Sequence, residues 1–268
     1  MNLLSLPDLP ANQLFDAADA NLATHATWVQ QRTAGMQAII APDLVLADSG
    51  LPTDTFNVIC HARLNLANAA ERIQTAVTHF TAANRPFSWW LTPGHQPADL
   101  GDLLLAAGLQ RADTELAMAA DLHRLPSGGV APGGLQIRRV RTTAQLRDFA
   151  RTLIGDGDPA ARRCYELAAP ALLAPGSPLW LYVGYLTGVS VATAELTIGG
   201  GVAGLYNVST LPAYRRRGFG RVLTLQPLLD ARAHGYHTAI LQAAEAGVNL
   251  YTHLGFAPFG QITEYKRL

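Results

Sequence analysis

The stretch from Tyr206 to Arg221 constrains this chain most, because strand-forming residues run there into a basic loop that carries two glycines. Pro212 ends the predicted strand, since proline has no N–H group to donate to a sheet. Gly218 and Gly220 let the backbone approach a bound group without interference from a Cβ atom. A helix that starts at this loop points unpaired N–H groups at the same spot, at the positive end of its dipole. The stretch therefore predicts a phosphate site built mainly from backbone.

The residues around the two glycines narrow the kind of phosphate ligand. Arg215, Arg216, Arg217 and Arg221 add positive charge. A Walker loop requires Lys-Ser/Thr after its glycines, which is missing, and a Rossmann fingerprint requires a glycine where this chain has Leu223. The pattern that remains is Arg-x-x-Gly-x-Gly after a strand. Across the chain 20 basic and 20 acidic residues cancel, so the arginines are a local feature and a nucleic-acid partner is not expected.

This pattern resembles the acetyl-CoA pyrophosphate loop of the GCN5-related N-acetyltransferase (GNAT) family. The resemblance continues through a predicted strand at 237–243 to Leu250–Phe256, which is similar to the family's last helix, with a tyrosine four residues before Gly-Phe. The alternative is an arginine-rich helix cap. The resemblance implies an α/β (α+β) fold, with a mixed, mostly antiparallel sheet flanked by helices. It also implies acetyl-CoA as co-substrate and no metal.

The resemblance assigns the cofactor-binding residues one by one. They are Val208, Ser209, Thr210, Arg215, Arg216, Arg217, Gly218, Phe219, Gly220, Arg221 and Asn249. The first three would hold the pantetheine arm and the thioester carbonyl, and the loop would hold the pyrophosphate. Three positions depart from the family pattern, of which Thr210, standing where an aliphatic residue is common, is a mild change. Ala244 stands where the family often hydrogen-bonds the CoA arm, a contact that is lost or supplied by Asn249. Pro227 lies inside the helix after the loop, where it is expected to cause a kink.

Acyl transfer from a thioester to an amine requires a polarised carbonyl, a neutral amine and a stabilised thiolate. The resemblance makes Tyr251 the acid for the leaving thiolate; the alternative is a core tyrosine. Glu195 is the leading candidate for the base, because it is the only acid on its predicted strand. An exposed strand carboxylate is the alternative, and Glu245 and Glu264 are weaker candidates. Asn207 either faces the acceptor or caps the end of the strand.

The chain is interpreted as two tandem GNAT-like units. A degenerate unit at 1–125 and a catalytic unit at 135–268 are joined by a Pro- and Gly-rich linker at 126–134. Phe56-Asn57-Val58 parallels Tyr206-Asn207-Val208, and Ala106–Leu109 parallels His253–Phe256.

The first half has no glycine-bearing loop after Val58 and carries Leu104 where the second half has its tyrosine. We therefore expect the first half to bind no CoA and to serve as a scaffold or as one wall of the acceptor cleft.

Periodicity and turn signals predict the order of the remaining elements. Helices are expected at 10–33, from Asn65 through Leu66 to Phe80, and at 100–107, 144–154, 219–234 and 246–254. Strands are expected at 36–40, 44–47, 55–60, 86–91, 115–122, 135–140, 179–185, 189–196, 202–208, 237–243 and 256–267.

Composition limits the setting of the reaction. No apolar run approaches the ~20 residues of a membrane span, and the first residues do not resemble a signal peptide. Cys60 and Cys164 are read as ordinary thiols of a cytoplasmic protein. The expected partner is a small-molecule or peptide amine, with no membrane partner, and the pattern does not indicate an oligomeric state. Two functions follow: an active N-acetyltransferase, or a CoA-binding or interaction module with little or no turnover.

Overall fold

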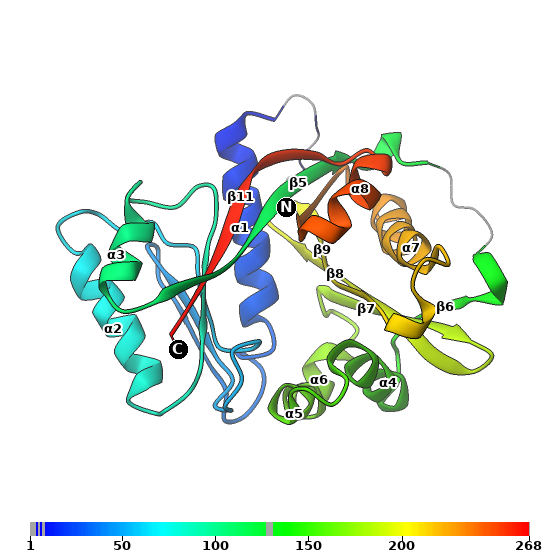
Figure 1. The fold of residues 1–268 in the computed structure, drawn as a ribbon, viewed down its shortest axis with the longest axis horizontal. Helices are drawn as coiled ribbons and strands as arrows, with labels where there is room; N and C mark the ends of the chain where they lie inside the picture. Colours follow the sequence, from blue (N-terminus) through cyan, green and yellow to red (C-terminus); the bar gives the residue numbers. More distant parts are fainter. Residues whose placement is uncertain (1–3, 5, 7–8, 127–130, 268) are drawn as a thin grey trace.

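The computed structural model describes residues 4, 6, 9–126 and 131–267. Its strands form one mixed sheet in the order β1-β2-β3-β4-β11-β5-β10-β9-β8-β7-β6 (Figure 1). The strands are β1 (Gln37–Ile40), β2 (Val45–Asp48), β3 (Val58–Cys60), β4 (Ser88–Leu91), β5 (Gln110–Asp121), β6 (Gln136–Arg139), β7 (Leu179–Leu186), β8 (Val189–Gly199), β9 (Val202–Thr210), β10 (Thr238–Ala243) and β11 (Ala257–Lys266). The helices are α1 (Ala11–Thr27), α2 (Ala69–Thr81), α3 (Leu100–Ala106), α4 (Thr143–Ile154), α5 (Pro159–Leu167), α6 (Ala169–Leu172), α7 (Phe219–Ala233) and α8 (Glu245–His253).

The two halves of the chain repeat one order of elements. The series β2, β3, α2, β4, α3, β5 is matched later in the chain by β8, β9, α7, β10, α8, β11. In each series an antiparallel pair, β2 with β3 or β8 with β9, precedes a crossover helix. The next strand then lies parallel to the second member of that pair. This topology agrees with the repeat predicted from short matching strings.

The last strand of each half lies in the other half's part of the sheet. β5 pairs antiparallel with β10, β11 pairs antiparallel with β4, and β5 and β11 pair with each other across the middle of the molecule (Figure 1). The sheet is therefore not divided at the predicted linker. Residues 127–130 of that linker lie outside the described residues, and Pro132–Gly134 forms a 3-10 turn. The boundaries 1–125, 126–134 and 135–268 stay an interpretation of the sequence.

Helices cover both faces of the second half. Figure 1 shows α7 and α8 on one side of β7, β8 and β9, and α4, α5 and α6 on the other. Buried leucines of α7 join Tyr251 and the inner face of β8 to β10 in the largest apolar core. The α4–α6 side has its own core with β7, and α2 and α3 share another with the strands of the first half. These three cores, together with two smaller clusters that pack around α1, support the sheet along its length.

Helix α1 belongs to the first half but is fixed to the sheet of the second. Asn21 is fully buried and donates through Nδ2 to three carbonyls of β8 and β9 at 2.9, 3.1 and 3.2 Å. Its Oδ1 accepts a hydrogen bond from the Tyr206 hydroxyl at 2.9 Å. A Cβ atom at Gly204 would collide with the Asn21 amide, and one at Gly200 would collide with the Ala17 carbonyl. These two glycines allow the helix to come this close.

Several details of the expected elements are wrong: α1 ends at Thr27 and not at 33, β3 begins at Val58 and not at 55, and β5 begins at Gln110 and not at 115. The helix expected from Asn65 begins at Ala69, because the Asn65 side chain accepts from the Asn68 N–H at 3.0 Å and caps the preceding turn. Leu66 is 77% exposed and does not belong to the apolar face of α2. Helices α5 and α6 were not predicted. Pro227 lies within α7, which continues past it to its end.

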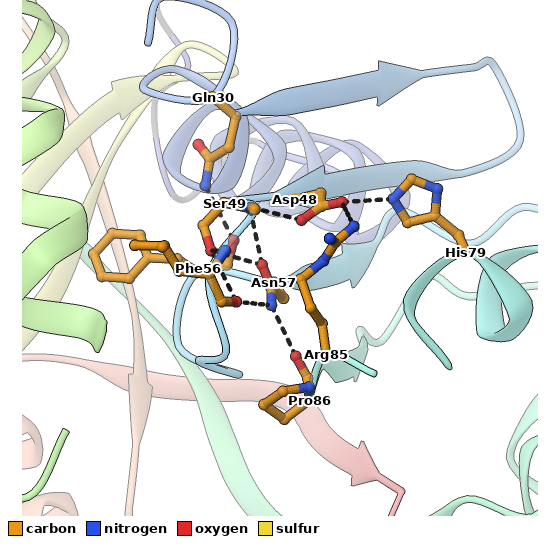
Figure 2. Close-up of polar contacts among 10 residues, drawn as sticks. Gln30, Asp48, Ser49, Phe56, Asn57, His79, Arg85 and Pro86 are labelled. Atoms are coloured by element: carbon orange, nitrogen blue, oxygen red, sulfur yellow. Dashed lines mark hydrogen bonds and ion pairs between the residues drawn. The ribbon is translucent and has the colours of Figure 1, made fainter. Parts of the chain in front are cut away.

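A buried polar cluster holds the loop between β2 and β3, and Figure 2 shows it. It comprises Gln30, Asp48, Ser49, Phe56, Asn57, His79, Arg85 and Pro86. Asn57 is fully buried; its Oδ1 accepts from the Ser49 N–H and hydroxyl, both at 2.8 Å. Gln30 donates to the Phe56 carbonyl at 3.2 Å. Phe56 is thereby held beside α1, facing the cavity described below.

Candidate active site

Strands β9 and β10 separate partway along their length. They pair only from Ala203 with Ala239 to Leu205 with Leu241. Beyond that point β9 stays paired with β8 up to Thr210, and β10 stays paired with β5 up to its end. Beyond Leu205 the edge of β9 that faces the split is therefore not paired with β10, which leaves room between the two strands for a ligand of extended shape.

A bulge in β9 places a side chain against Glu195. The register with β8 shifts between Thr193 and Glu195, and Asn207 adopts a positive φ of 53° there. The Asn207 side chain donates to Glu195 Oε2 at 2.9 Å, and its carbonyl accepts from the Thr193 hydroxyl at 3.0 Å. The alternative, that Asn207 caps the end of the strand, is wrong, because its side-chain amide donates to the Glu195 carboxylate and not to a backbone carbonyl at the strand end.

The loop before α7 has the conformation that its glycines suggest. Gly218 is left-handed, with φ of 81°, and is the N-cap residue of α7. A Cβ atom at Gly220 would only touch Leu250 at 3.7 Å, an ordinary contact. The folded chain itself therefore leaves room for a side chain at Gly220, and an approaching ligand is a physical reason for its absence.

The four arginines around this loop carry uncompensated charge. Arg215, Arg216, Arg217 and Arg221 are exposed, and none forms an ion pair with any described residue. Arg215 Nε donates to the Thr210 carbonyl at 3.0 Å, which orients its guanidinium at the end of β9. Together with the amides at the start of α7, they form an anion site without a neutralising carboxylate.

A cavity of about 1070 Å³ runs from this loop through the strand split to the first half of the chain. Its lining includes ten of the thirteen residues predicted from the sequence. These are Glu195, Val208, Thr210, Arg215, Arg216, Gly218, Phe219, Gly220, Arg221 and Tyr251. Ser209, Arg217 and Asn249 are not in the lining. Ala244 lines the cavity, whereas Asn249 is exposed on α8 and lies outside the lining. Asn249 therefore does not supply a contact in place of Ala244.

Tyr251 is buried and faces this cavity. A Cβ atom at Gly247 would lie 2.9 Å from the Tyr251 ring, so the absence of a side chain there makes room for the ring. Burial, and secondly the charge of Glu115, raise the pKa of Tyr251 to about 12. Its hydroxyl makes no hydrogen bond to any described residue of the chain. The phenol is thus a protonated, uncommitted donor at neutral pH.

Glu195 is 2% exposed, so the alternative of an exposed strand carboxylate is wrong. Asn207 donates a hydrogen bond to Oε2 of Glu195, and Oε1 of Glu195 lies 3.0 Å from Nδ1 of His25, a residue of α1. Nothing in the sequence pointed to His25, because it precedes Glu195 by most of the chain. Glu264 lines the cavity and accepts from the Ser88 hydroxyl at 2.6 Å. Glu245 is exposed and lies outside the lining.

Both halves of the chain contribute to a charged wall of the cavity, of which sequence reasoning had named only Glu264. Asp54 and Glu115 come from the first half, and Glu264 and Lys266 come from β11 of the second. Lys266 Nζ lies 2.9 Å from Asp54 and 3.2 Å from Glu264. Burial, then the charges of Asp113 and Glu264, raise the pKa of Glu115. The first half therefore lines part of the cavity, and its role as a wall of an acceptor cleft stays a prediction.

Two features, a cluster of metal ligands and a membrane-spanning helix, are absent from the part of the chain that the structure describes. Residues 4, 6, 9–126 and 131–267 hold no group of three or more His, Cys, Asp and Glu side chains placed to bind a metal ion. Within the same ranges no helix combines the length and the apolar character that crossing a membrane requires.

Comparison with known proteins agrees with the geometry. Residues 144–256 match the acetyltransferase (GNAT) family, so this segment of the second half is a GNAT domain. No protein with a curated description matches the chain in sequence. The predicted family and fold class are confirmed.

Solved structures resemble the chain over nearly its whole length. A GCN5-related N-acetyltransferase from Kribbella flavida is 21% identical, with a TM-score of 0.69 over 92% of this chain and 95% of its own. One from Sphaerobacter thermophilus is 14% identical, with a TM-score of 0.61 over 99% and 94%. A tandem GNAT protein from the clavulanic acid biosynthesis pathway is also 14% identical, with a TM-score of 0.59 over 99% and 97%. At these identities the likeness shows the fold, and it includes a tandem arrangement.

Proposed function

We propose that this protein is an acetyl-CoA-dependent N-acetyltransferase. It would move an acetyl group to a primary amine of a small molecule or peptide, by direct transfer in a ternary complex. The observation that carries the proposal is the single cavity that joins the arginine-rich start of α7, the split between β9 and β10, Tyr251 and Glu195.

The chain's own groups fit the parts of the co-substrate. The amides at Gly218–Gly220 and the guanidinium groups of Arg215, Arg216 and Arg221 would bind the pyrophosphate. The free backbone edge of β9 from Val208 to Thr210 would hold the pantetheine arm and polarise the thioester carbonyl. Ser209 would contribute through its backbone only, since its side chain is not in the lining. Acetyl-CoA supplies the activated acyl group.

Tyr251 would donate a hydrogen bond to the sulfur as the thioester breaks. Glu195 would act on the acceptor side, where an amine must lose a proton before it attacks. An alkyl amine has a pKa of about 10.4, so its neutral form at pH 7 costs ~4.6 kcal/mol, and a nearby base lowers that cost. We expect the reaction to be cytoplasmic and to require no metal, nucleic acid or membrane.

The second candidate is a CoA-binding or interaction module with little or no turnover. One observation favours it: Ala244 lines the cavity with a methyl group where the family often has a hydrogen-bonding side chain. Loss of that contact weakens positioning of the arm, but it leaves the pyrophosphate site intact.

Two measurements on the full chain test the proposal. Calorimetry with CoA should show binding, and release of free thiol from acetyl-CoA should rise when a panel of primary amines is added. Binding without amine-dependent thiol release would favour the second candidate. Absence of binding at millimolar CoA would exclude both.

A further inference from the structure

Helix α1 brings a histidine of the first half to the presumed acceptor side of the cavity. The His25 ring stacks on Tyr206 with centroids 4.0 Å apart and planes 6° from parallel. Its Nδ1 lies 3.0 Å from Glu195 Oε1 and 3.1 Å from the Thr197 hydroxyl. The ring is therefore fixed by three residues of β8 and β9, although it belongs to a helix that precedes them by most of the chain.

The position of His25 depends on the close packing of α1 against β8 and β9. Asn21, one turn before it, bonds three carbonyls of the sheet and accepts from the Tyr206 hydroxyl. Gly204 leaves space for that amide. The same tyrosine thus holds Asn21 with its hydroxyl and His25 with its ring. This arrangement gives the imidazole one orientation, with Nδ1 toward Glu195.

Glu195 needs a positive partner at this depth. A carboxylate that is 2% exposed loses most of its hydration, and an ionised carboxylate is stable there only with a paired charge or hydrogen bonds. Asn207 supplies one hydrogen bond. Within the described residues, His25 is the only basic side chain at ion-pair distance from Glu195. An imidazolium formed at His25 during the reaction would therefore lie beside a carboxylate.

The other nitrogen of the ring is uncommitted. Nε2 of His25 makes no hydrogen bond to any described residue, and His25 lines the cavity with 24% of its side chain exposed. The other titratable groups nearby do not compete for the proton at neutral pH. Burial raises the pKa of Tyr206, and that of Tyr165, which faces Glu195 from α5. Burial also raises the pKa of the Cys60 thiol.

We propose that His25 is the group that takes the proton from the acceptor ammonium, with Glu195 as the residue that orients the ring and lies beside the imidazolium that forms. The proposal rests on the proposed function and deepens it: the first half of the chain supplies a catalytic residue to the second. Glu195, the predicted base, then acts through His25, because Asn207 donates to its Oε2 and the His25 ring lies at ion-pair distance from its Oε1, which accepts no hydrogen bond from the described residues.

The step balances as follows. The ammonium gives one proton to Nε2 of His25, and the freed lone pair on nitrogen attacks the thioester carbonyl carbon. A C–N bond forms and the C–S bond breaks, with its electron pair moving to sulfur under a hydrogen bond from Tyr251. The second proton of the amine nitrogen ends on sulfur as the free thiol. The imidazolium of His25 returns its proton to solvent.

Two amines of similar shape separate this role from a structural one. Benzylamine is protonated at neutral pH, whereas aniline is already neutral. We expect His25→Gln to lower kcat/KM for benzylamine by about 10²-fold or more, the scale of general base catalysis. Its kcat/KM for aniline should change by less than about threefold, because no base is needed there. His234→Gln, on an exposed histidine at the end of α7, is the matched control and should change neither.

Equal losses for both amines in His25→Gln, or no loss, would overturn the proposal. Glu195→Gln provides a second test. It should also lower kcat/KM for benzylamine far more than for aniline, because it removes the residue that orients the His25 ring; equal losses for the two amines would also overturn the proposal. Failure of the proposed function itself would give a different result: the wild-type chain would not bind CoA.

Discussion

Replacing Tyr251 by phenylalanine tests the leaving-group role with a single lost hydroxyl. The ring keeps its edge-to-face contact with Phe256 at 5.9 Å and its place beside Gly247. The hydroxyl makes no hydrogen bond to the described residues, so its loss leaves no buried group without a partner. We therefore expect the free energy of unfolding to change by less than ~0.5 kcal/mol.

The pKa of Tyr251 sets the size of the catalytic effect. At about 12 it lies ~3.5 units above that of a simple thiol, so complete proton transfer to the thiolate is uphill by about 5 kcal/mol. The phenol therefore acts as a hydrogen-bond donor to developing charge. Removal of one such donor costs about 10²–10³ in kcat, or ~2.7–4 kcal/mol. The affinity for acetyl-CoA, which depends on the loop and on β9, should stay within about twofold.

The assay is thiol release at saturating acetyl-CoA, with CoA affinity measured by calorimetry. Because burial raises the pKa of Tyr251, the hydroxyl stays protonated until the pH approaches about 12. The wild-type kcat should therefore show no decline caused by this residue between about pH 7 and pH 10. A kcat in Tyr251→Phe within about threefold of wild type would refute the role.

Three other changes test the architecture. Gly220→Ala should keep the melting temperature of wild type, because its Cβ meets only an ordinary contact at 3.7 Å, and it should weaken CoA binding about tenfold or more. The control is Gly176→Ala, because a Cβ atom at Gly176 has nothing within 4 Å. Equal CoA affinity in the two variants would contradict the loop's role. Gly204→Ala should lower the free energy of unfolding by ~1–3 kcal/mol, because its Cβ would collide with the Asn21 amide that holds α1 against the sheet. Denaturant melts that show no loss of stability would argue against this role of Asn21. Cys60 and Cys164 are fully buried, and burial raises the pKa of both thiols, that of Cys164 to about 11. Neither should react with a disulfide reagent at pH 8 until the chain unfolds, and rapid labelling of the native chain would disprove their burial.

Local sequence was enough to predict the pyrophosphate loop and the position of Tyr251. The left-handed Gly218, the end of β9 and the start of α7 are set by residues close to one another in the chain. Turn, strand-end and helix-start signals act over a few residues, so they can be read without knowledge of distant partners. The same holds for the order of elements that the two halves share.

Long-range pairing decided the rest of the site. The exchange of β5 and β11 brings Glu115 and Glu264 to the cavity, and the seat of α1 brings His25 to Glu195. Strand register and helix docking depend on packing between segments far apart in sequence, for which one chain's local pattern has no signal. Burial of Glu195 and exposure of Asn249 follow from the same packing. The sequence by itself therefore determined the loop and the strand at which we propose that a pyrophosphate and a thioester bind, and only the tertiary structure decided which side chains line the proposed acceptor side.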